Sequence, residues 1–370
     1  MSKSLFRVKP VEPAPHVDAG EPVEGSLHGE ATLKRTLTAR HLVLLGVGAV
    51  IGAGIFVLTG QAAANHAGPA IMLSFVFAGM ACALAGLCYA EFAAMMPVSG
   101  SAYSYSYATL GEFTAWFIGW CLVLEYLFAS STVAVGWSGY MVSFLTTTLG
   151  VPFPAELATA PITWSNGEFV RTAGIVNLPA ILIVAAVSGL CYVGITQSAF
   201  ANAVVVAIKV AVIAAFLGFG VMYVDPANWT PFIPANEGPG QFGMDGVFRA
   251  ATIVFFAYIG FDAVSTAAGE AKNPQRDMPI GILGSLVVCT LIYISVCAVL
   301  VGMAPFRELD TAKPVATAIE LAMRADPGAN LGWLKTAVEV GAIAGLSSVI
   351  LVMLMAQPRI FYSMSRDGLL

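Results

Sequence analysis

The sequence predicts an all-α integral membrane protein, and two observations carry that prediction. Of its 370 residues, 58% are hydrophobic and 11% are charged, and the mean hydropathy is +0.81. Soluble domains contain about 25% charged residues. In addition, the apolar residues form uncharged runs of about 20 residues, the length at which a helix crosses a bilayer. We therefore expect a bundle of helices in contact with lipid.

The sequence argues against several classes of function. No basic run is interleaved with aromatic residues, so no nucleic-acid partner is predicted. The six cysteines fall in apolar runs and the four histidines are scattered, so neither a metal site nor a cofactor is predicted. No set of nucleophile and base, metal cluster or phosphate loop is recognisable, so we do not expect an enzyme.

The first 40 residues differ from the rest of the chain. They are polar, rich in Pro, Glu and Lys, and lack the apolar core of a cleaved signal peptide. We predict a disordered tail over residues 1–40 and a transmembrane domain over residues 41–370.

Eight spans are predicted in the transmembrane domain. Gly68-Pro69 separates the first from the second, Pro97–Gly100 opens a Ser/Tyr-rich turn after the second, and residues 194–198 divide the fourth from the fifth. Polar loops follow the third, fifth and seventh spans, and a tail containing Pro358 follows the eighth. The predicted spans cover residues 41–64, 70–95, 113–145, 176–193, 201–223, 246–268, 279–301 and 334–356.

Lysine and arginine are concentrated before the first span, between the sixth and seventh spans, and after the eighth. The positive-inside rule then predicts that the N-terminus lies in the cytoplasm. Eight spans return the C-terminus to the same side.

The first span contains the segment Gly46–Gly60, which holds five glycines, with Gly52-Ala53-Gly54 near the middle of the apolar run. Each glycine destabilises a helix by about 1 kcal/mol relative to alanine. The spacing imitates a dinucleotide fingerprint, but the strand and the soluble βαβ unit that such a site needs are missing. Two readings remain for the glycines: close helix packing through Gly48-x-x-x-Gly52, or a helix broken at mid-membrane to form a binding site.

The sixth span is interrupted in the same way. Gly260 and Asp262 lie inside the apolar sequence Phe255–Ala263, although a charge at the centre of a bilayer is costly. Interrupted spans at corresponding positions of two halves point to a transporter site at the interface between repeats. This coincidence favours broken helices in spans 1 and 6.

These residues resemble a known family. The segment Gly46–Gly60, the stretch from Ala90-Glu91-Phe92 to Gly100 with its following tyrosines, and Phe256–Asp262 are together similar to the amino acid–polyamine–organocation (APC) superfamily, and within it to bacterial relatives of the cationic amino acid transporters. The resemblance runs from about residue 36 to the end. It implies a LeuT-type fold of two inverted five-helix repeats, here about residues 41–223 and an incomplete second repeat of about 246–370.

The resemblance also implies a substrate site for amino acids. The unwound first helix would receive the α-carboxylate, and the unwound sixth helix would offer carbonyls to the α-ammonium. The implied residues are Ile51, Gly52, Ala53 and Gly54 in the first break, and Phe256, Ala257 and Ile259 in the second.

Three ionisable residues inside spans are further candidates. In proton-coupled relatives a lysine in the context of Lys209 takes the place of a sodium ion and contacts the first helix; the alternatives are a fixed ion pair or a lysine reaching an interface. Glu125 matches a glutamate that lines the substrate site in the cationic branch, or it satisfies helix ends or backbone nearby. For Asp262 we favour a capping role at the second break over binding or gating.

Members of this family have twelve or more spans, whereas eight are predicted here, so we expect a fragment or a truncated chain. The predicted function is secondary active amino acid transport across the cell membrane, coupled to protons, with lipid, amino acid and protons as partners. The alternative is a non-transporting membrane protein that binds amino acids as a sensor or assembly partner. The resemblance suggests a cationic substrate, while close relatives carry small neutral ones.

Overall fold

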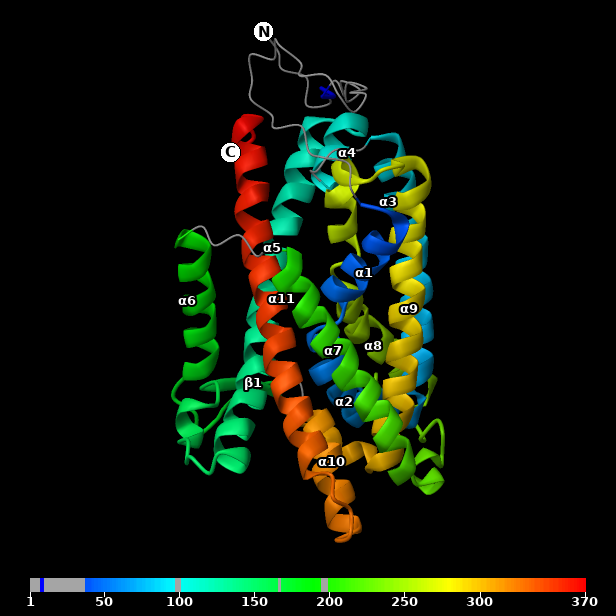
Figure 1. Ribbon diagram of the computed structural model, residues 1–370, viewed down its shortest axis with the longest axis vertical. Coiled ribbons are helices and arrows are strands. Elements are labelled where there is room, and N and C mark those ends of the chain that lie inside the picture. Colours follow the sequence, from blue (N-terminus) through cyan, green and yellow to red (C-terminus); the bar gives the residue numbers. More distant parts are fainter. Residues whose placement is uncertain (1–6, 10–36, 97–100, 166–167, 194–198) are drawn as a thin grey trace.

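The computed structural model describes residues 7–9, 37–96, 101–165, 168–193 and 199–370. These residues form a long helical bundle with one short β-hairpin (Figure 1). The α-helices are α1 (Ala39–Val50), α2 (Thr59–Ala62), α3 (Ile71–Met95), α4 (Ser101–Thr109), α5 (Glu112–Ser143), α6 (Leu178–Val193), α7 (Ala199–Gly220), α8 (Gly243–Val254), α9 (Pro274–Met303), α10 (Pro314–Ala325) and α11 (Gly332–Arg366). The strands are β1 (Ile162–Ser165) and β2 (Glu168–Arg171), which pair antiparallel.

Long helices packed in pairs build the core. Helix α11 runs along α5, and α9 packs against both α3 and α1. Helix α6 stands at the edge of the bundle, where it packs against α5 and α11 (Figure 1). The interior is lined by apolar side chains such as Phe75, Tyr293 and Leu346, while large apolar side chains elsewhere point outward, as expected for a surface in lipid.

Within the described residues, five helical stretches are long and apolar enough to cross a membrane. They are Gly54–Met95, Glu112–Thr148, Val204–Tyr223, Pro274–Met303 and Gly332–Arg366. The other predicted spans coincide with elements that are short or interrupted: α1, α6, and α8 with the segments that follow it. The helical membrane fold is therefore confirmed, and the two spans that we expected to be broken are broken.

Three regions differ from the prediction. The polar loop after the seventh span contains helix α10, whose buried face carries Val315 and Ile319. The predicted Ser/Tyr-rich turn forms helix α4, whose three tyrosines, Tyr103, Tyr105 and Tyr107, are all buried. Helix α11 continues to Arg366 instead of ending before Pro358, which lies exposed on the helix surface; the helix runs on although this proline removes one backbone hydrogen bond.

Some predictions fall outside the described residues. These are most of the tail, at residues 1–6 and 10–36, the Pro97–Gly100 segment, and the division at residues 194–198. The division of the chain into two repeats stays a prediction.

Candidate functional site

The first helix break lies between α1 and the π-helical segment η1 (Gly54–Leu58). Helix α1 ends at Val50, and Ile51 has extended backbone angles, φ −70° and ψ 102°. The glycines allow other backbones to approach here. A Cβ on Gly54 would clash with the Cα and Cβ of Ala257, and one on Gly52 would lie 2.9 Å from a methyl carbon of Val349.

The second break lies between α8 and the 3-10 segment η9 (Asp262–Glu270). After the short 3-10 turn η8 (Phe255–Tyr258), Ile259 leaves the helical region and Gly260 has φ +112°. A side chain at that φ is strained, and a Cβ on Gly260 would also lie 3.0 Å from the carbonyl oxygen of Ala49. The two breaks are therefore in direct contact.

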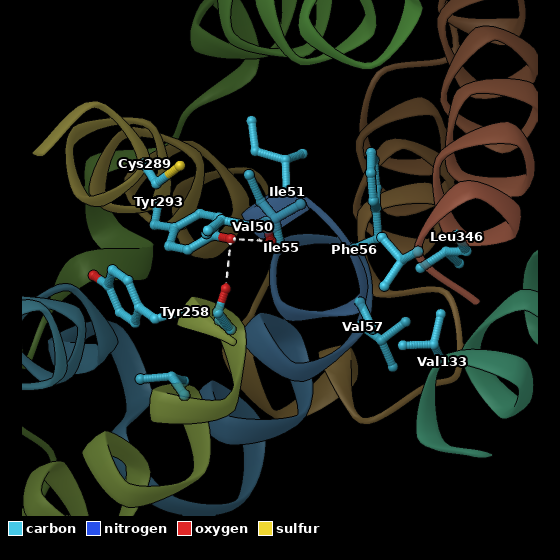
Figure 2. Close-up of a cluster of buried hydrophobic side chains, with 14 of the residues drawn as sticks. Val50, Ile51, Ile55, Phe56, Val57, Val133, Tyr258, Cys289, Tyr293 and Leu346 are labelled. Atoms are coloured by element: carbon cyan, nitrogen blue, oxygen red, sulfur yellow. Dashed lines mark hydrogen bonds between the residues drawn. The ribbon is translucent and has the colours of Figure 1, made fainter. Parts of the chain in front are cut away.

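Side chains from three other helices satisfy carbonyls that the breaks release. The Tyr293 hydroxyl of α9 bonds to Val50 O at 2.9 Å and to Ala257 O at 2.8 Å, one acceptor from each break. Figure 2 shows the Tyr293 ring between the two segments, with these bonds as dashed lines. The Tyr140 hydroxyl of α5 donates to Phe56 O at 2.6 Å.

Lys209 of α7 is the third of these side chains. Its ammonium group donates to Gly48 O at 3.2 Å and to Ile51 O at 3.1 Å, and the residue is 1% exposed. The sequence predicted that this lysine contacts the first helix, and the geometry agrees. Its partners are the carbonyls at the end of α1, so the contact would change if the break moved.

A small cavity of about 20 Å³ lies where the breaks meet. This space holds about one water molecule, so a larger ligand requires the surrounding helices to move apart. Six of the predicted substrate residues line it, whereas Ile51 and Glu125 do not. Its lining comprises Ala49, Val50, Gly52, Ala53, Gly54, Ala129, Val133, Phe256, Ala257, Ile259, Val349 and Met353.

The walls away from the breaks were not predicted. They are formed by Ala129 and Val133 of α5 and by Val349 and Met353 of α11, all apolar. Such residues look like ordinary membrane-helix packing in a single sequence. The fully buried Tyr293 was missed for the same reason.

The predicted acidic residues are not among those that line the cavity. Glu125 is on α5, one helical turn before Ala129, in a half-buried position. Asp262 is the first residue of η9, where an acidic side chain complements the helix dipole, and its carboxylate accepts a bond of 3.4 Å from the Tyr126 hydroxyl. The capping role of Asp262 and the substrate role of Glu125 stay predictions.

Comparisons with known proteins agree with this geometry. Residues 37–370 match the amino acid permease family. The chain is 46% identical to the branched-chain amino acid permease BcaP of Bacillus subtilis, over 100% of this chain and 73% of that protein. It is also 46% identical to the methylthioribose transporter of the same organism, over 99% of this chain and 73% of that protein.

More distant relatives extend the comparison. Cationic amino acid transporter 3 of Arabidopsis thaliana is 37% identical, over 93% of this chain and 54% of that protein. The fold resembles the crystal structure of MhsT in complex with L-phenylalanine, a LeuT-like protein, with a TM-score of 0.60 and 16% identity over 90% of this chain and 75% of that one. The broken helices, their contact and these matches lead to one conclusion: the chain belongs to the amino acid permease family of the APC superfamily.

Proposed function

We propose that this chain is a secondary active amino acid permease that moves its substrate across the cell membrane by alternating access, driven by protons. The observation that carries the proposal is the contact of two broken helices around a cavity that α5 and α11 complete. Such a site at the meeting of interrupted helices is typical of secondary transporters. The positive-inside distribution of Lys and Arg supports a cytoplasmic N-terminus. Membership of a transporter family argues for transport and against an enzyme.

The backbone at the breaks has the chemistry to hold a zwitterion. The first N–H groups of a helix have no acceptor within it and carry a partial positive charge. Gly54 and its neighbours at the start of η1 would therefore face the α-carboxylate. The carbonyls around Phe256–Ile259 would face the α-ammonium, and the Ala257 carbonyl keeps a second lone pair besides the one that Tyr293 uses.

The cavity walls favour a neutral, apolar substrate side chain. Ala129, Val133, Val349 and Met353 offer no hydrogen-bonding groups, and a charge buried against them would be costly. A cationic substrate, which the sequence resemblance implies, would need to reach Glu125 one turn further along α5. Because the relatives include a branched-chain permease and cationic transporters, we keep the cationic class as the second candidate.

Lys209 would supply the coupling. As an ammonium group it has three hydrogens, of which two are bonded to Gly48 O and Ile51 O. When it loses its proton it loses its charge, and both bonds to the first break weaken. Protonation of Lys209 would therefore stabilise one arrangement of the break, and deprotonation would release it.

Uptake of radiolabelled leucine and arginine into proteoliposomes, with and without an inward proton gradient, tests the proposal. We expect gradient-driven leucine uptake that exceeds arginine uptake, and loss of the gradient dependence in Lys209→Ala. The matched control is Val210→Ala, because this neighbouring side chain is 40% exposed on the outside of the bundle. It should behave like the parent.

Other outcomes separate the alternatives. Arginine uptake that exceeds leucine uptake would replace the neutral class by the cationic one. Uptake that ignores the gradient in the parent would contradict proton coupling. Saturable binding with no uptake under any condition would favour the amino acid-binding sensor over the permease.

A further inference from the structure

A cluster of charged and hydroxyl side chains lies at the end of the bundle away from the C-terminal end of α11. Helix α10 lies there across the bundle (Figure 1), between α9 and α11 in sequence and in contact with both. It also packs on η1 and α2, the segments that follow the first break. The Val315 side chain shares a cavity of about 10 Å³ with Ile55, Phe56 and Val338, among others.

Two lysines bind the same carboxylate on α10. Lys313 Nζ lies 2.7 Å from Glu320 Oε1, and Lys335 Nζ of α11 lies 2.8 Å from the same oxygen. Each lysine also donates to a hydroxyl near the end of α5, with Lys313 bonded to Ser143 at 2.8 Å and Lys335 to Thr147 at 2.7 Å. These bonds therefore connect α10 to both α5 and α11.

A second carboxylate anchors the group inside the protein. Glu339 is 0% exposed on α11, one turn beyond Lys335. Its two oxygens accept hydrogen bonds from Ser143 and Thr148, and Lys335 lies 3.7 Å away. A buried carboxylate is stable only where such partners surround it, so separating α5 from α11 here would leave Glu339 without its two hydroxyl donors.

We propose that Lys313, Glu320, Lys335 and Glu339 form a latch that stabilises the state closed on the α10 side. This inference rests on the proposed function, because it assigns the latch to one state of an alternating-access cycle. The Lys335–Glu320 bond and the Lys313–Ser143 bond require α10 to lie on the bundle, so both are lost when α10 lifts, whereas the Lys313–Glu320 pair stays within α10. A set of contacts made in one state only shifts the equilibrium toward that state. All four are positioning residues: Lys313, Glu320 and Lys335 hold α10, and Glu339 holds Lys335 and the end of α5.

Accessibility of a cysteine at Val338 tests the latch. Val338 is 0% exposed and shares a small cavity with Val315 of α10, so movement of α10 would make it reachable. The Val338→Cys protein is reconstituted in proteoliposomes and treated with a membrane-impermeant thiol reagent. The rate of modification is read by mass spectrometry of the peptide that carries residue 338, which leaves the six native cysteines in place.

Glu320→Gln removes the charge that both lysines bind, and we expect it to raise the labelling rate by at least about fivefold, the lower range of effects on coupled equilibria. The matched control is Glu237→Gln, because Glu237 forms an ion pair of 2.6 Å with Arg307 in the loop before α10 and both side chains are about half exposed. The control should label at the parent rate. An equal rate in Glu320→Gln and the parent would overturn the latch.

A second variant keeps the test decisive if Glu320→Gln does not fold. Thr147→Val removes the hydroxyl that Lys335 binds without leaving a charge alone. It should also raise the labelling rate, by a smaller factor, and no rise would overturn the latch.

Uptake is measured in parallel. Faster labelling without uptake in any protein supports the latch while the proposed transport fails, and transport with unchanged labelling overturns the latch alone.

Discussion

Tyr293 connects the two helix breaks through a single hydroxyl group. A hydroxyl has one hydrogen to donate, yet Val50 O and Ala257 O both lie within 2.9 Å of this oxygen. The two carbonyls come from segments that are 207 residues apart in sequence and have lost their regular helical partners. The side chain therefore fixes the distance between the breaks as well as filling space in the core.

We expect Tyr293→Phe to destabilise the protein. The change leaves the carbonyls of Val50 and Ala257 buried with one donor fewer, which costs about 1–3 kcal/mol. The thermal unfolding midpoint in detergent should fall by several degrees. Tyr362→Phe is the control, since that side chain is 67% exposed on α11. Equal midpoints for both variants and the parent would refute the role of the hydroxyl.

At the scale of elements, glycine decides where the helices stop and how closely they meet. Gly54 lies against Ala257, and Gly260 lies against Ala49, so each break depends on the other for its shape. The sequence predicted the first break from its clustered glycines, which are costly in an apolar helix, and the second from Gly260 and the charge of Asp262 at the corresponding place in the sixth span. It also predicted the contact of Lys209 with the first helix, through the family resemblance.

Gly54→Ala should push the breaks apart. Its new methyl group would clash with Ala257, including a backbone atom that cannot rotate away. We expect lower yield of monodisperse protein on size exclusion and loss of substrate-induced thermal stabilisation. Gly218→Ala on α7 is the matched control, because nothing lies within 4 Å of the added carbon; it should be neutral or stabilising by up to about 1 kcal/mol. Normal behaviour of Gly54→Ala would contradict the close contact of the breaks.

Other elements could not be read from the sequence. Helix α10 lies in a stretch that contains Lys313, Glu320 and Arg324, so the sequence reads as a polar loop. Its apolar face can be recognised as buried only when the contact with α11 is known. Val349 and Met353 look like any lipid-facing or packing residues until the cavity identifies their side of α11. These features depend on contacts between residues far apart in the chain, and one sequence carries no record of such pairs.

At the scale of the whole molecule, polar contacts close both ends of the bundle. At the end where α11 terminates, Asp367 accepts from Tyr103 at 2.9 Å and pairs with Lys9 at 2.7 Å, which joins the N-terminal segment to α4 and α11. At the other end, the latch residues hold α10. The cavity between the two ends has a volume of only about 20 Å³.

The latch also makes the stability of the whole fold depend on pH. Burial raises the pKa of the Glu320 carboxyl, but the hydrogen bonds and charges of Lys313 and Lys335 outweigh it, so the pKa lies below the ordinary value. A carboxyl with a lowered folded pKa stabilises the fold fully above the unfolded value, about 4.3, and loses this contribution as the pH falls through the folded pKa.

We therefore expect the parent to unfold at a higher temperature than Glu320→Gln near neutral pH, and the difference to shrink below about pH 4. Differential scanning fluorimetry over a pH series measures both midpoints. The exposed-pair variant Glu237→Gln should stay close to the parent throughout. A parent advantage that is the same at every pH would show that Glu320 acts through packing and not through its charge.

Pro358 is a point at which α11 can bend, and it divides the helix into two parts. Proline has no N–H, so the carbonyl of Leu354, four residues earlier, loses its helical partner, and the helix bends more easily at this place. Val349, Met353 and Glu339 lie before the weak point, and Asp367 lies after it. The terminal turns of α11 can thus swing while the rest of the helix stays straight. A bend at this point would move Asp367 and leave the hydrogen-bonded turns on either side intact.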